Sequence, residues 1–153
     1  MNSTQIILYL PNKPDLENYS KKKSLKNLQN GEVKKIIKLT GNHWRKIFSI
    51  LSKISIGLSS IQEKTWQEYR DEVLLTKQGG EVISFSMKVI ESSSSIHILS
   101  GKAHYENFNI PIEKFKAIDT EGRILRYKNI FLTPYFDYRQ FPNALIETLI
   151  KHV

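Results

Sequence analysis

The sequence predicts an α/β protein, a three-layer sandwich in which a central, mainly parallel sheet lies between helices. Short apolar runs that end in polar or proline-containing loops alternate with segments whose apolar residues recur every three to four positions. Strands separated by helices must cross over before they can pair, which favours a parallel sheet. With 153 residues, 40% of them apolar, the chain is expected to form a single domain over residues 1–153.

Three apolar runs are the predicted strands. Residues 5–10 form a buried run that closes in a Pro/Asn-rich loop, and two further runs cover residues 96–99 and 126–132. We expect residues 5–10, 96–100 and 129–132 to be parallel neighbours in one sheet. Residues 82–90 fit both a strand and a helix face, so the sequence leaves them open.

The predicted helices differ in the clarity of their pattern. Asn42 is the expected N-cap of an early helix whose apolar face is formed by Trp44, Ile47, Phe48, Leu51 and Ile54. A second helix around residues 66–74 is expected to stop before Gly79-Gly80, and a short one covers residues 101–108. Residues 16–40 are polar and lysine-rich, with a weak helical spacing. Pro142 is expected to open the last helix, which buries Leu145, Leu149 and Ile150.

Positive charge is concentrated in the first third of the chain. Residues 1–53 hold 11 Lys and Arg against Asp15, Glu17 and Glu32, so the whole net charge of +8 lies there. Lys21, Lys22 and Lys23 are the densest run, and they can follow a phosphate backbone by releasing its counterions. A solvated face that binds nothing explains the same lysines, and charge alone does not separate the two alternatives.

The remaining composition excludes several classes of protein. The chain has no cysteine, which removes disulfides, thiolate metal sites and cysteine nucleophiles. No apolar run is long enough to span a bilayer, and residues 1–10 lack the pattern of a signal peptide, so we expect a cytoplasmic protein without a membrane partner. The four histidines have no metal-ligand spacing, and no nucleotide- or cofactor-binding motif is present; we expect neither metal nor cofactor.

Three segments resemble the mismatch-specific uracil-DNA and thymine-DNA glycosylases of the uracil-DNA glycosylase superfamily. Ile96-His-Ile-Leu-Ser-Gly-Lys-Ala-His-Tyr-Glu-Asn-Phe108 is similar to the family's strand-to-helix stretch A-I-L-G-K-x-A-Y-E-x-F. Ile130-Phe-Leu-Thr-Pro-Tyr-Phe-Asp-Tyr138 stands where the family has a strand followed by N-P-S-G-L-S. Gly41-Asn-His-Trp-Arg-Lys46 is similar to G-N-x-F-W-K at the start of an early helix. The resemblance implies a uracil-DNA glycosylase-like fold and a role on DNA.

The first loop of the resemblance departs from the family's pattern. The family's G-x-N-P-G loop holds an Asn that orients the attacking water, whereas this chain reads Leu10-Pro-Asn-Lys-Pro-Asp15, without glycine. By the resemblance Asn12 is the candidate to hold water, Asp15 the only nearby carboxylate for a general base, and Lys13 a phosphate contact. A plain Pro/Asn-rich turn capped by Asp15 is the alternative.

The second loop departs further, because bulky residues replace small ones. Tyr135, Phe136 and Tyr138 are candidates to stack on bases or to wedge between them, with Thr133 and Arg139 as phosphate contacts. Alternatively, the aromatic residues complete the core at the end of a buried strand.

Three functions are compatible with these observations. The first is an active base-excision glycosylase, and the second is a catalytically impaired relative that binds nucleic acid, DNA above all, or a protein partner. The third is a scaffold domain without a role on nucleic acid. Loss of the small residues from both loops favours the second over the first.

Overall fold

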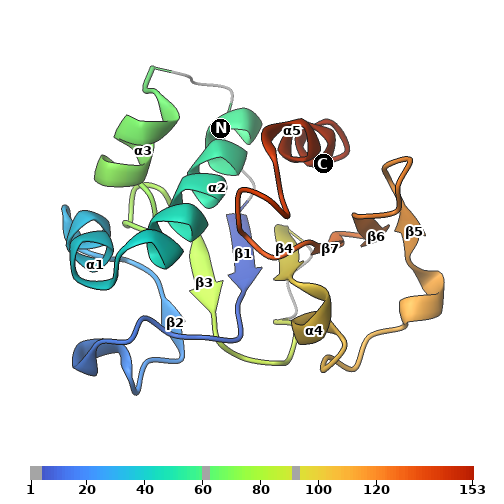
Figure 1. Cartoon of the computed structure of the whole chain (residues 1–153), viewed down its shortest axis with the longest axis horizontal. Coiled ribbons are helices and arrows are strands. Elements are labelled where there is room, and N and C mark those ends of the chain that lie inside the picture. The colour runs from blue at the N-terminus through green and yellow to red at the C-terminus, as the bar shows by residue number, and fades with distance from the viewer. Residues whose placement is uncertain (1–4, 60–62, 91–93) are drawn as a thin grey trace.

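The computed structural model of the chain describes residues 5–59, 63–90 and 94–153, which form a seven-stranded mixed sheet with helices (Figure 1). The strands are β1 (Gln5–Tyr9), β2 (Ser24–Leu25), β3 (Val82–Ser84), β4 (Ser95–Ser100), β5 (Lys116–Ala117), β6 (Leu125–Tyr127) and β7 (Ile130–Thr133). The helices are α1 (Glu32–Thr40), α2 (Asn42–Leu58), α3 (Trp66–Glu72), α4 (Lys102–Tyr105) and α5 (Asn143–Lys151), with the 3-10 turns η1 (Glu17–Tyr19) and η2 (Ile112–Lys114). The α/β class predicted from the sequence is confirmed.

The centre of the sheet is parallel, in the strand order β2-β3-β1-β4-β7-β6-β5. β1 pairs in parallel with both β3 and β4, and β4 pairs in parallel with β7, so the predicted neighbours are confirmed. The outer strands β2, β6 and β5 are antiparallel. The carboxyl ends of β3, β1, β4 and β7 therefore lie along one edge of the sheet, called the carboxyl edge below, and the opposite edge is the amino edge.

The two faces of the sheet are covered unequally. Along β1, Ile6 and Leu8 belong to the larger core, which the side chains of α1, α2 and α5 complete, while Ile7 and Tyr9 point into a smaller one. On that second face, α4 and the segment that follows it supply the cover, chiefly through Phe108 and Phe115. The layers are compatible with a three-layer sandwich whose second helical layer is thin.

Helix α2 has the predicted apolar face, with Trp44, Ile47 and Leu51 buried, but its start differs from the prediction. Gly41 rather than Asn42 is the N-cap, and no side chain caps this helix end. At the other end, a Cβ at Gly57 would overlap the side chain of Ile150, so glycine allows α2 and α5 to pack closely.

One further prediction of element bounds is wrong, and one is confirmed. The expected strand over residues 126–132 is two antiparallel strands, β6 and β7, because the chain reverses at Lys128, whose φ is +54°. The helix predicted around residues 66–74 is α3, which begins at a capping box formed by Thr65 and Glu68 and stops before Gly79, as expected, with its last residue at Glu72.

The regions that the sequence left open are now defined. Residues 82–84 of the ambiguous stretch are strand β3, and the lysine-rich segment 16–40 contains η1, β2 and α1. Within the described residues no helix is long and apolar enough to cross a membrane. Residues 1–4, the start of the segment compared with a signal peptide, lie outside the described residues.

Candidate functional site at the carboxyl edge of the sheet

The first candidate loop leaves the sheet directly after β1. The amide of Leu10 donates a hydrogen bond to the carbonyl of Ser84 (3.0 Å), so pairing with β3 continues up to the loop. Asn12 and Asp15 are exposed, and neither side chain hydrogen-bonds to a residue that the structure describes. The side chain of Lys13 is held in place by a hydrogen bond from its Nζ to the carbonyl of Ser20 (3.1 Å). Both predicted catalytic residues are therefore open to solvent.

The three consecutive lysines reach the same edge from β2. The amide of Phe85, just beyond the end of β3, donates to the carbonyl of Lys23 (3.0 Å). Because β2 runs antiparallel to β3, Lys21 and Lys22 lie beyond the carboxyl end of β3, and all three lysines are exposed. The Nζ of Lys13 lies 5.9 Å from the ring centroid of the same Phe85. Two lysine-bearing segments therefore meet around the end of β3.

In the second loop, Thr133 and Phe136 are buried, with 1% and 0% of their surface exposed. The amide of Phe136 donates to the hydroxyl of Ser100 (3.1 Å), and its ring packs edge-on against Phe141 with centroids 5.4 Å apart. The Thr133 hydroxyl donates locally to the carbonyl of Pro134 (2.9 Å). For Phe136 the structure matches the alternative in which an aromatic residue completes the core.

Tyr135 joins three segments of the carboxyl edge. Its hydroxyl hydrogen-bonds to Nε2 of His43 near the start of α2 (2.7 Å), and the two rings stack with centroids 5.8 Å apart. A Cβ at Gly101, which directly follows β4, would lie 3.3 Å from Cδ1 of Tyr135. Burial, and then the nearby carboxylate of Asp137, raise the pKa of Tyr135 above that of a free tyrosine. This tyrosine is held in place by its neighbours.

Beyond Tyr135, a row of alternating cations and aromatic rings runs along α2. Lys46 and Lys53 lie 5.9 and 5.4 Å from the ring centroid of Tyr138. Lys53 is also 4.6 Å from the ring of Trp66, which Arg70 approaches to 5.5 Å. We call these five residues the cation–aromatic row. Tyr138 is 38% exposed, so its ring is accessible to a ligand.

Asp137 and Arg139 end the second loop. The amide of Arg139 donates to Oδ1 of Asp137 (2.9 Å), while Lys46 forms an ion pair with Oδ2 (3.3 Å). These contacts, the amide first, lower the pKa of Asp137 below its usual value. Lys46 therefore neutralises the acidic residue of this loop, whereas the side chain of Arg139 is exposed.

The two candidate loops lie at the same edge of the sheet, and the strand between them separates the strands that they follow. Strand β4 lies between β1 and β7. Among the described residues, no hydrogen bond, ion pair or ring contact links residues 11–15 to residues 133–139. Within the same described part of the chain, no group of three or more His, Asp or Glu side chains is placed to hold a metal ion. The candidate site is consequently an extended surface along the carboxyl edge of the sheet.

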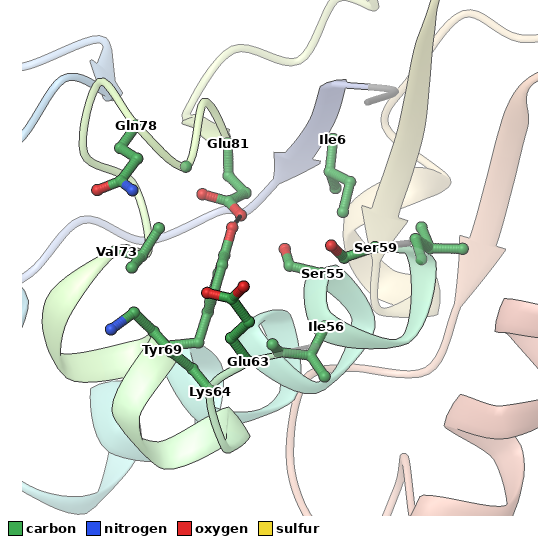
Figure 2. A pocket seen from close by; sticks show the side chains of 12 residues that line it. Ile6, Ser55, Ile56, Ser59, Glu63, Lys64, Tyr69, Val73, Gln78 and Glu81 are labelled. Atoms are coloured by element: carbon green, nitrogen blue, oxygen red, sulfur yellow. Dashed lines mark hydrogen bonds between the residues drawn. The ribbon is translucent and has the colours of Figure 1, made fainter. Parts of the chain in front are cut away.

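A cavity of about 290 Å³ lies at the opposite, amino edge (Figure 2). The start of β1, the end of α2, α3 and the turn before β3 line it. The side chain of Glu81, only 3% exposed, borders this cavity and accepts hydrogen bonds from the hydroxyl of Tyr69 and from the amide of Leu75.

Of the cation–aromatic row, only Tyr138 was a candidate from the sequence. The seven-residue spacing of Lys46 and Lys53 places both lysines on one face of a helix. That spacing is the only sequence signal for the row. No signal marks Glu81, since its burial depends on the tertiary position of Tyr69.

Comparison with known proteins places the chain in a family. A family model described as a family of unknown function, DUF6942, matches residues 1–153. No curated protein matches the chain, and no solved structure does. Because that model covers the whole chain, the protein belongs to DUF6942, a family of unknown function.

Proposed function

We propose that the protein binds nucleic acid, DNA in the first place, along the carboxyl edge of its sheet, as a catalytically impaired relative of the uracil-DNA glycosylases. The observation that carries the proposal is the position of Lys21, Lys22 and Lys23. The hydrogen bond from Phe85 to the carbonyl of Lys23 holds this run beyond the end of β3, close to the loop that contains Lys13.

The charge of this edge favours a polyanion. The first third of the chain carries the entire surplus of +8, and its exposed lysines at the end of β3 are free of acidic partners among the described residues. The start of α2 lies at the same edge, as the contact between His43 and Tyr135 shows, and the positive end of a helix dipole adds to the attraction.

The cation–aromatic row supplies contacts of a second kind. An exposed ring such as Tyr138 can stack on an unpaired base, while the ammonium group of Lys53 beside it, which forms no ion pair with a described residue, meets a phosphate. The row begins at the second loop, which is attached to the edge through Tyr135. The proposal therefore extends from the lysine run across the edge to α2.

We expect the catalytic activity of the protein to be weaker than that of the uracil-DNA glycosylases that it resembles. Two prolines fix φ on either side of the Asn12-Lys13 pair and remove amide donors that could contact a base. Asn12 and Asp15 have no partners among the described residues that would orient them towards a water molecule. In support of a glycosylase-like fold, the segments that carry the resemblance form β4 with α4, β7 with its loop, and the start of α2.

The test is a comparison of two variants with the same change of charge. Fluorescence anisotropy at low salt would measure binding of labelled single-stranded and duplex DNA and of RNA. We expect replacement of Lys21, Lys22 and Lys23 by Glu to weaken binding by about tenfold or more. The control replaces Lys77, Lys116 and Lys151, which are exposed and lie away from the lysine run, and should weaken binding far less.

The result can fail in two ways. Absence of binding to every nucleic acid at low salt would refute the proposal and leave the protein partner or scaffold alternatives. Equal losses in the two variants would show that attraction is general and that the carboxyl edge has no special role.

A further inference from the structure

The cavity at the amino edge has the size and composition of a site for a small molecule. Its volume of about 290 Å³ is near the lower end of the range for ligand pockets. Figure 2 shows the carboxylates of Glu63 and Glu81 and the hydroxyls of Ser55 and Ser59 facing the same space. Apolar side chains, among them Ile6, Ile56 and Val73, form another part of the wall, which Lys64, Tyr69 and Gln78 also border.

The carboxylates of the cavity lack a cationic partner among the described residues. Glu81 is held by two neutral donors, the Tyr69 hydroxyl and the Leu75 amide (2.9 Å). Lys64 borders the cavity, but it forms an ion pair with Glu72 on α3 (3.3 Å). A buried carboxylate without a counter-charge is costly, so a cation that enters this space gains more than it would in water.

The side chain of Ser55 is a second, independent indication of a ligand. It is 7% exposed, borders the cavity, and its hydroxyl forms no hydrogen bond of ordinary geometry with a described residue. It lies close enough to the Tyr69 hydroxyl to moderate the rise in the pKa of Tyr69 that burial causes. A buried hydroxyl that lacks a full hydrogen bond is a suitable acceptor for a donor on a ligand.

Gly79 keeps Glu81 in this position. A Cβ at residue 79 would lie 2.5 Å from Oε1 of Glu81 and equally close to the carbonyl of Val73. Any larger residue at position 79 would displace the Glu81 carboxylate. The turn before β3 therefore requires glycine at this position to keep the carboxylate in place.

We propose that this amino-edge cavity binds a small protonated amine. An ammonium group offers three donors and no acceptor, which matches two carboxylates and the Ser55 hydroxyl. The apolar wall suits a short alkyl chain attached to the nitrogen. An anion of the same size would be repelled by Glu63 and Glu81, and a neutral molecule would leave their charge uncompensated.

The experiment uses three probes of similar size that differ in charge: ethanolamine, ethylene glycol and glycolate. Each is titrated into the full chain at constant ionic strength, and chemical shifts of the backbone amides are followed by NMR. We expect ethanolamine alone to give saturable shifts, and we expect them at residues that line the cavity.

Variants assign the interaction to the cavity. Glu63 is exposed, so Glu63→Gln should fold normally and weaken ethanolamine binding by about tenfold or more. Glu113→Gln removes an exposed carboxylate on η2, which does not line the cavity. This variant should leave the affinity for ethanolamine unchanged. Ser55→Ala should also weaken binding while the protein stays folded.

Three outcomes would overturn the proposal: no saturation with ethanolamine, equal binding of ethylene glycol, or equal affinity of wild type and Glu63→Gln. None of them bears on nucleic-acid binding at the opposite edge, so the two proposals succeed or fail separately.

Discussion

The hydroxyl of Tyr135 lies 2.7 Å from Nε2 of His43, although the two residues are 92 positions apart in the chain. This contact fixes the loop after β7 against the start of α2, and Gly101 packs closely against the same tyrosine. The carboxyl edge is thus shaped by a packed aromatic residue.

Gly101→Ala tests how tightly this contact is packed. Residue 101 has φ of +92° and ψ of +131°, a conformation that residues other than glycine rarely adopt, and a Cβ there would lie 3.3 Å from Tyr135, so we expect a loss of about 2–3 kcal/mol in the free energy of unfolding. Gly122→Ala is the control, because φ is +69° but nothing lies within 4 Å of the added Cβ. The control should lose only about 1–2 kcal/mol, the cost of the backbone alone. Urea denaturation measures both, and equal losses would show that Tyr135 is free to move.

Because His104 is buried, we expect the stability of the protein to depend on pH. The imidazole is 5% exposed, its Nε2 has no hydrogen-bond partner among the described residues, and burial lowers its pKa. The unfolded chain therefore takes up a proton at a higher pH than the folded one, so stability is lost as pH falls below about 6.5. His104→Leu should show a smaller loss of stability between neutral and acidic pH, measured by thermal denaturation. An unchanged pH dependence would mean that His104 titrates alike in both states.

Tyr138 is expected to contribute to the binding of single strands. Tyr138→Leu removes an exposed ring from the cation–aromatic row and should weaken binding of single-stranded DNA by about 1–3 kcal/mol. Tyr127→Leu is a matched control, since Lys114 and Lys128 also flank that ring, at 5.8 and 5.2 Å, but it lies on β6. Equal losses in anisotropy titrations would argue against a specific role for the row.

We expect little or no release of uracil from duplex DNA. Asn12 is exposed between two prolines, and Phe136 is buried in the core, so neither loop offers a glycine-bordered backbone that could closely contact a flipped base. The assay uses uracil- and mismatch-containing oligonucleotides, followed by alkaline cleavage of abasic sites, with Asn12→Ala as the control. Robust turnover that Asn12→Ala abolishes would establish an active glycosylase.

The central sheet was predictable because continuous apolar runs identify strands that are buried on both faces. Residues 5–10 and 96–99 have this pattern, and β1 and β4 are the two innermost strands of the parallel centre. The turn at Lys128 was not predictable, since apolar residues continue on both sides of it without glycine or proline. Two-residue strands such as β2 are too short to show a period.

The candidate site was only partly predictable. Sequence order placed Asn12, Asp15 and Tyr135 after parallel strands, and the structure has them at one edge. It did not indicate that Phe136 would turn inward and Tyr138 outward, because this depends on packing against Phe141 and on the lysines of α2. Contacts between distant segments decide which aromatic residues remain accessible.

The salt dependence of DNA binding tests the central proposal most directly. A variant with Lys21, Lys22 and Lys23 replaced by Gln loses three charges at the carboxyl edge. If each lysine neutralises a phosphate of duplex DNA, the slope of log K against log salt concentration should become shallower by about 0.9 per lysine. A slope equal to that of the wild type would contradict the account, because the lysine run would then lie outside the nucleic-acid interface.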